Sequence, residues 1–157
     1  MSLLSDALDR LEALYPEAMK PGLSAAEIEA LLEDFPMHLP EEFYELYQRS
    51  DGLNHRNPQT LFFGFGRLFS LSQALEYYCE LCGYANYHAG WFPVLSLEEL
   101  VYAIRGDRER QKTAPIIAFG YEDLSHRPDY DLHPAMKYPS LTETMVDAVY
   151  QLENPYG

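Results

Sequence analysis

Two cysteines, Cys79 and Cys82, form the most recognisable ligand pattern in the chain, C-x-x-C. A structural zinc ion needs four ligands, usually from two such pairs, and here His88 is only a distant third candidate. A redox pair is disfavoured as well, because no thioredoxin-like strand precedes the motif. Both cysteines fall on the apolar face of a predicted helix. The pattern therefore favours two buried thiols in the core.

A second group with ligand chemistry is Asp129, Asp131 and His133, with Asp123 and His126 nearby in the sequence. Carboxylate oxygens and imidazole nitrogens could together hold a divalent metal ion. The spacing is not that of an EF-hand, and no glycine stands at the sharp turn that such a loop requires. We interpret these residues as solvated side chains of a loop and assign no metal site.

Motifs of nucleotide binding and nucleophilic catalysis are missing from the sequence. The run Gly64-Phe-Gly66 lacks the third glycine of a dinucleotide loop and fits a sheet bulge better. There is no P-loop, no H-E-x-x-H and no G-x-S-x-G. None of the five histidines has a nearby serine or cysteine in a known nucleophile motif. We therefore predict no enzymatic activity and no cofactor.

Aromatic residues are the remaining signal, because the chain contains 13 tyrosines. Tyrosine and tryptophan are over-represented among the residues that dominate the energy of protein interfaces. Tyr84, Tyr87 and Tyr121 lie in or beside predicted loops, and Glu122 and Asp123 could add an acidic rim. We predict that these five residues contact a protein partner. The aromatic clusters from which they are chosen are Tyr77, Tyr78, Tyr84, Tyr87 and Trp91, then Tyr121, Tyr130 and Tyr138.

The composition is that of a folded soluble chain. With 157 residues, 47% apolar residues and 14% aromatic residues, it should form one domain over residues 1–157 with a substantial core. It has no apolar run of about 18 residues, so no membrane span is expected. The first 15 residues are acidic and amphipathic, unlike a signal peptide. We expect a cytoplasmic location.

The net charge of −14 limits the choice of partner. Residues 1–54 hold 12 acidic and 3 basic residues, and residues 55–157 hold 13 acidic and 8 basic residues. Such a field repels nucleic acid and anionic membranes, and it attracts and steers a basic protein. The charge is also what solubility alone would require of helix surfaces.

The two helices between residues 21 and 54 have clear start and stop signals. Ser24 and Glu27 match a capping box. Pro36 is expected to end the first helix, because its ring clashes with the preceding turn. Pro40 suits the start of the second helix, and Gly52 a left-handed cap at its end. The apolar positions are Ile28, Leu31, Leu32 and Phe35 in the first helix, and Phe43, Leu46 and Tyr47 in the second.

The rest of the chain mixes helix and strand signals. Strands are predicted at residues 60–63, 68–71, 91–95 and 114–119, the last of them central, and Pro93 is tolerable only at an edge or end. Helices are predicted over residues 3–15, over 72–82 with Gly83 as the stop, and from Ser140 to the end. Ser96 and Glu99 also match a capping box, so the segment through Ile104 is predicted as helix despite its strand-like composition. Residues 122–139 look like a long loop. Together these elements predict an α+β fold, with N-terminal helices and a C-terminal helix packed on a small, mainly antiparallel sheet.

The string PGLS-x-x-EIE-x-L, then LP-x-x-F-x-x-LY and S-D-G-L, resembles the opening of the SUKH superfamily. This family includes fungal cell-wall-assembly regulators and bacterial toxin-immunity proteins. The resemblance is clearest over residues 21–54, and it continues more weakly through Trp91-Phe-Pro-Val94 and the last helix. It implies a non-catalytic α+β binding domain. Residues 72–89 depart from the family pattern, because they look helical where family members more often run from strand to strand.

The leading hypothesis is an immunity-like protein that binds and neutralises a partner, possibly a basic toxin domain, through an acidic and aromatic surface. The first alternative is a housekeeping regulatory or scaffold protein with the same domain. The second alternative is a metal-dependent enzyme that uses Asp129, Asp131 and His133. The sequence does not set the oligomeric state.

Overall fold

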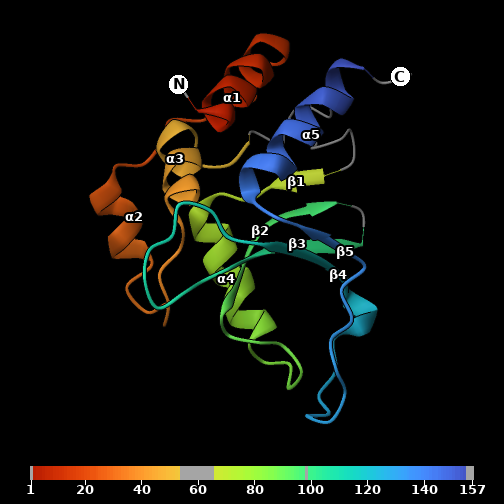
Figure 1. Cartoon of the computed structure of the whole chain (residues 1–157). Coiled ribbons are helices and arrows are strands. Elements are labelled where there is room, and N and C mark those ends of the chain that lie inside the picture. The colour runs from red at the N-terminus through yellow and green to blue at the C-terminus, as the bar shows by residue number, and fades with distance from the viewer. Residues whose placement is uncertain (1, 54–65, 98, 155–157) are drawn as a thin grey trace.

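Five α-helices and five strands form in the part of the chain that the computed structural model describes, residues 2–53, 66–97 and 99–154 (Figure 1). Three helices come first, a helix interrupts the strands, and a helix closes the chain, so the predicted α+β fold is confirmed. The predicted strand at residues 60–63 and most of the 64–66 turn lie outside the described residues. The elements are α1 (Leu3–Leu14), α2 (Ala25–Leu31), α3 (Glu41–Arg49), β1 (Gly66–Leu68), α4 (Leu71–Leu81), β2 (Trp91–Leu97), β3 (Leu100–Arg105), β4 (Ile116–Gly120), β5 (Met136–Tyr138) and α5 (Leu141–Glu153).

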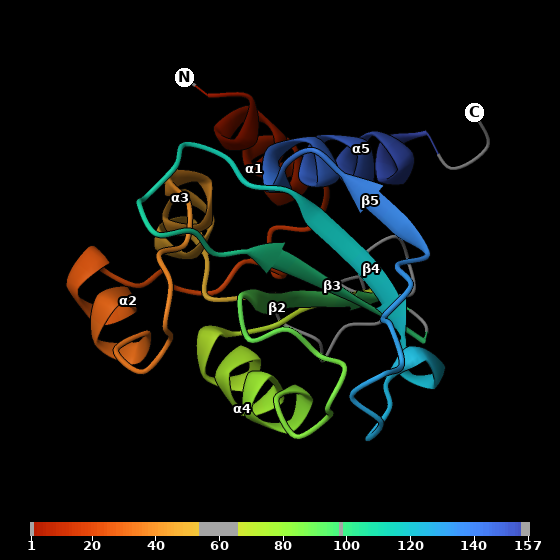
Figure 2. The same cartoon turned by 60° about the horizontal axis from the view of Figure 1, so that its bottom comes forward.

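The five strands make one antiparallel sheet in the order β1-β2-β3-β4-β5. Each strand pairs with the next one in the chain, and α4 fills the connection between β1 and β2. Helices α1, α3 and α5 lie on one side of the sheet, while α4 lies on the other side, beside β2 (Figures 1 and 2). The predicted strand at 114–119 corresponds to β4, which is an inner strand, although β3 is the middle one.

The inner strand β4 is buried on both faces of the sheet. Ile116 and Ala118 belong to the core under α1, α3 and α5, and Ile117 and Phe119 belong to a second core on the opposite face. This alternation is the two-residue period of a strand. The second core is closed by Leu81 at the end of α4 and by side chains from two loops, among them Tyr87, Leu124 and Leu132.

Serine caps start most of the helices. The hydroxyls of Ser24, Ser70 and Ser140 each accept a hydrogen bond from the amide three residues later, at the starts of α2, α4 and α5, and the capping box predicted at Ser24 is confirmed. Ser2 caps α1 in the same way.

The prediction of a helix from Ser96 to Ile104 is wrong, because this segment forms the end of β2 and the strand β3. The two strands form a hairpin in which Leu97 pairs with Leu100. Val101 and Ile104 lie on opposite faces of β3. Ile104 packs in the core under α1, α3 and α5, and Val101 packs in the second core. A capping-box match adds little energy, so strand pairing on both sides of β3 decides the outcome.

Three smaller predictions also need correction. Helix α2 ends at Leu31, before Pro36 could stop it, and the Leu31 side chain is exposed. Pro93 lies inside β2, but β1 pairs only with residues 95–97, so no partner on that side needs the missing N–H at Pro93. The loop predicted at 122–139 contains β5 and the end of a 3₁₀ turn, Tyr121–Asp123.

The residues of the P-G and S-D-G strings connect the segment before α2, the end of α3 and the start of α4. A Cβ on Gly22 would lie 1.8 Å from the carbonyl oxygen of Gln48, so only glycine fits there. Gly52 has φ of 81°, the left-handed conformation predicted for it. Ser50 Oγ accepts from the Lys20 amide at 2.9 Å and donates to the Gly52 carbonyl at 2.6 Å. The Asp51 carboxylate accepts from the first amide of α4, that of Leu71, at 2.8 Å.

A buried carboxylate, that of Glu42 in α3, joins three elements. It accepts hydrogen bonds from the amide of Ala114 at 2.8 Å and from the amide and hydroxyl of Thr142 at 2.7 and 2.9 Å. These donors come from the segment before β4 and from the first turn of α5. With three donors, this carboxylate is well compensated for its loss of water.

We predict that Glu42→Ala lowers the free energy of unfolding by about 3 kcal/mol, because the buried donors lose their acceptor. Urea denaturation of wild type and variant measures the difference. Glu41→Ala is the matched control, since Glu41 is exposed, and should change stability by about 0.5 kcal/mol or less. A loss below about 1 kcal/mol for Glu42→Ala would contradict the assigned role.

Candidate functional site

Tyr121 is the centre of an exposed aromatic surface on the α4 side of the molecule. It begins the 3₁₀ turn that follows β4, and 48% of it is exposed. Its ring meets that of Tyr77 of α4 edge to face, with centroids 6.0 Å apart, and Tyr77 stacks in turn on Phe69 at 5.4 Å. The Tyr77 hydroxyl is buried with no hydrogen-bond partner among the described residues, which is unfavourable for folding.

Two hollows open on either side of the Tyr77–Tyr121 pair, and both include Glu80. Hollow A has a volume of about 420 Å³, and hollow B has a volume of about 310 Å³. Hollow A is also lined by Leu81, Gly83, Tyr84, Leu124 and His126, and hollow B by Arg67, Phe69, Gln73, Glu76 and Ser96. A third depression, beside Tyr121, is bounded by Glu99, Leu100, Gly120 and Glu122.

Four exposed glutamates surround Tyr121: Glu76, Glu80, Glu99 and Glu122. None of these glutamates forms an ion pair with another described residue. By contrast, the acidic residues Asp9 and Glu12 of α1 both pair with Arg49. Hydrogen bonds to Glu12 and Asp9 raise the pKa of Arg49. We name Tyr77, Tyr84, Tyr121 and the four glutamates the acidic aromatic surface.

Three of the five residues predicted to contact a partner lie in this surface. Tyr121 and Glu122 are exposed, and Tyr84 is half-buried with its ring stacked on His126 at 5.0 Å. Tyr87 instead is buried, with 8% exposed, and its hydroxyl donates to the Trp91 carbonyl. Burial raises the pKa of Tyr87.

Asp123 accepts hydrogen bonds within its own turn and from the loop that follows α4. Its carboxylate accepts from the Gly120 amide at 3.2 Å, and its carbonyl accepts from the Asn86 side chain at 2.7 Å. The Asn86 side chain also accepts from the Ser125 amide at 2.7 Å. Asn86 therefore connects the loop after α4 to the loop after β4, and it holds Tyr84 and Tyr121 in a defined arrangement.

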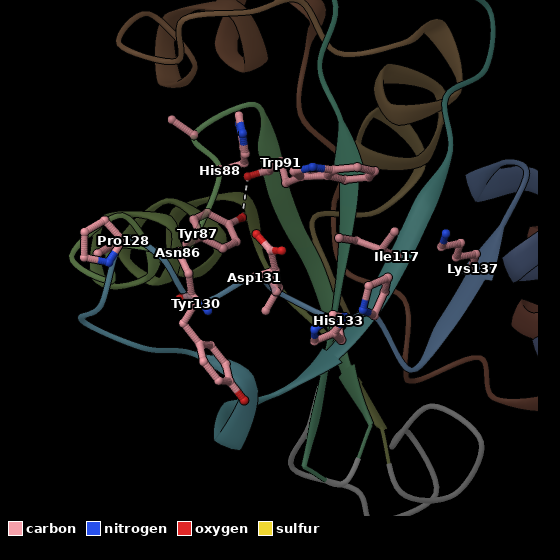
Figure 3. Close-up of a pocket in the computed structure, with 14 residues that line it drawn as sticks. Asn86, Tyr87, His88, Trp91, Ile117, Pro128, Tyr130, Asp131, His133 and Lys137 are labelled. Atoms are coloured by element: carbon pink, nitrogen blue, oxygen red, sulfur yellow. Dashed lines mark hydrogen bonds between the residues drawn. The ribbon is translucent and has the colours of Figure 1, made fainter.

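A separate and larger pocket, the Trp91 pocket, lies on the second face of the sheet (Figure 3). It has a volume of about 830 Å³, and Figure 3 shows Trp91 and Ile117 on the strands, with Asp131 and His133 on the long loop. Asp129, the remaining member of the metal hypothesis, pairs with Arg127 at 3.5 Å. Across the described ranges, no three His, Cys, Asp or Glu side chains lie close enough together to hold a metal ion.

The prediction that Cys79 and Cys82 are buried is wrong, because both thiols are free and exposed. The inward face of α4 is formed by Leu71, Ala74 and Leu81. Each cysteine follows an inward-facing position by one residue and therefore points away from the core. The inward face of α4 is rotated by about one residue from the face that the sequence spacing predicted.

Comparisons with known proteins add no family. No protein-family model matches the chain, and no curated protein gives a significant match. Of the helices described, none combines the length and apolar content needed to cross a membrane.

Sequence reasoning did not select Glu76, Glu80 and Glu99 as surface residues, and it named Tyr77 only as a member of an aromatic cluster. The missed signal is a pair of like charges four residues apart towards the carboxyl end of α4. Like charges at this spacing repel, and carboxylates near the carboxyl end of a helix oppose its dipole. Residues that oppose the stability of their own helix are candidates for function.

We predict that Glu80→Gln raises the free energy of unfolding by about 0.5 kcal/mol, because both repulsions are relieved. Chemical denaturation with a precise midpoint measures the change. The control Glu17→Gln removes an exposed carboxylate from a turn and should leave the midpoint unchanged. A destabilised Glu80→Gln protein would show that Glu80 supports the fold.

Proposed function

We propose that the chain is a non-catalytic protein-binding domain of the SUKH type, with an immunity-like role and a basic protein, such as a toxin domain, as its partner. The acidic aromatic surface is the observation that carries this proposal. An exposed tyrosine at its centre and unpaired carboxylates around it combine an apolar anchor with a charged rim. Interfaces concentrate binding energy in such anchors, and rim charges steer the encounter.

The net charge supports a basic partner. The chain carries −14 overall, and the four glutamates around Tyr121 are not neutralised by neighbouring cations within 4 Å among the described residues. Long-range attraction would raise the association rate with a positively charged protein and repel nucleic acid.

The structural role of the motif residues supports the resemblance to SUKH domains. Gly22 and Ser50 connect the segment before α2 with the end of α3, and Asp51 and Gly52 connect the end of α3 with the start of α4. Residues that fix a joint of the fold would be kept among domains that share the fold and differ in partner. The exposed free thiols of Cys79 and Cys82 suit a reducing compartment, which supports the cytoplasm as the location.

We predict that the partner binds with a strongly salt-dependent association rate. The partner is first captured from the native cells at low salt, identified and purified. Stopped-flow mixing should then show the association rate constant falling by about tenfold or more as salt rises from about 0.05 to about 0.5 M.

A single substitution tests whether the partner binds at the acidic aromatic surface. Tyr121→Ala should weaken affinity by about a hundredfold, as expected for a central aromatic anchor. The matched control is Tyr150→Ala on α5, since Tyr150 is also exposed, at 56%. A salt-insensitive rate, or equal affinity for the Tyr121→Ala and wild-type proteins, would overturn the proposal.

A further inference from the structure

Hollow A and hollow B share Tyr77, Glu80 and Tyr121 but differ in their other charged residues. Hollow B adds a second carboxylate, Glu76, and a cation, Arg67, which repels a cationic ligand, whereas no lysine or arginine lines hollow A. In hollow A the charged side chain is Glu80, and the other ionisable neighbour with basic character is His126. Hollow A is therefore the one suited to a cation.

Three tyrosines line hollow A, with one face of the Tyr77 ring stacked on Phe69 and one face of the Tyr84 ring stacked on His126. Tyr77, Tyr84 and Tyr121 contribute rings, and Leu81 and Leu124 contribute apolar contact. The Tyr77 and Tyr121 rings are nearly perpendicular, with an angle of 78° between their planes. A flat cation that stacks on the face of one ring would thus lie nearly perpendicular to the plane of the other.

We propose that hollow A binds the guanidinium group of an arginine side chain presented by the partner. This inference rests on the proposed function and gives the partner one specific feature. A guanidinium is planar, stacks on aromatic rings, gives up water more readily than an ammonium group and donates two parallel hydrogen bonds to a carboxylate. Glu80 supplies that carboxylate at the rim.

Lysine and neutral side chains fit hollow A less well. The lysine ammonium group is compact and strongly hydrated, so an aromatic wall compensates little of its desolvation. Citrulline has nearly the shape of arginine without the charge, so it keeps the stacking and loses the ion pair with Glu80. The order of binding should therefore be arginine, then lysine, then citrulline.

The probe is the peptide acetyl-Gly-Arg-Gly-amide, compared with its lysine and citrulline analogues at equal concentration. Amide signals of Gly83 and Leu124, which line hollow A, are followed by heteronuclear NMR of the full chain. We expect saturable shifts with the arginine peptide and at least about fivefold weaker binding of the lysine peptide. Because the lysine peptide carries the same charge, it controls for ionic strength.

Two variants and two controls locate the peptide. Glu80→Gln and Tyr121→Ala should each weaken binding by about fivefold or more. Glu17→Gln and Tyr150→Ala should bind as the wild type does. Equal shifts with the arginine, lysine and citrulline peptides, or unchanged binding by both variants, would overturn the inference.

Failure of this inference is distinguishable from failure of the proposed function. If the arginine peptide does not bind and a captured basic partner still depends on Tyr121, the arginine site is wrong and the docking surface stands. If the captured partner is also indifferent to Tyr121, both proposals fail.

Discussion

The constraint on which this structure depends is that β4, an inner strand of its sheet, is buried on both faces. All five residues of β4 are buried, so the two sides of the strand each need a cover. Helices α1, α3 and α5 provide one cover. Among the described residues, the second face is closed by the carboxyl half of α4 and by two loops, and Figure 2 shows α4 on that side of the sheet. The loops are consequently structural, and they are held together through Asn86. A surface built on such loops presents its side chains in fixed positions, which lowers the entropy lost on binding.

The acidic aromatic surface combines features that reduce the stability of the fold. The Tyr77 hydroxyl is buried with no partner among the residues described, and Glu80 lies near the carboxyl end of α4, four residues after the like charge of Glu76. The opposite side of the molecule contains well-paired polar groups, among them Glu42 and the Tyr47 hydroxyl, which donates to the Phe69 carbonyl at 2.8 Å. Well-paired polar groups in the helical layer and an unpartnered hydroxyl and repelling carboxylates near Tyr121 are the pattern expected where part of a surface is kept for binding.

Local signals in the sequence predicted the parts of the fold that depend on local energy. The serine caps at Ser24, Ser70 and Ser140 and the buried run of β4 could be predicted because neighbouring residues determine them. β3 could not, since its strand state depends on β2 and β4, which the sequence does not place beside it. The acidic aromatic surface was also only partly predictable, because it too depends on contacts between distant parts of the chain. Loop position predicted exposure for Tyr121, but Tyr87 in a similar loop is buried by the sheet, and the packing of Tyr77 against Tyr121 joins distant parts of the chain.

The central claim is that the partner binds at the surface around Tyr121. Hydrogen–deuterium exchange of the purified complex, compared with the free protein, tests this claim most directly. We predict slower exchange on complex formation in residues 76–84 and 120–126, with α1 and α5 unchanged. Protection confined to α1 and α5, or to the loop at the Trp91 pocket, would contradict the claim.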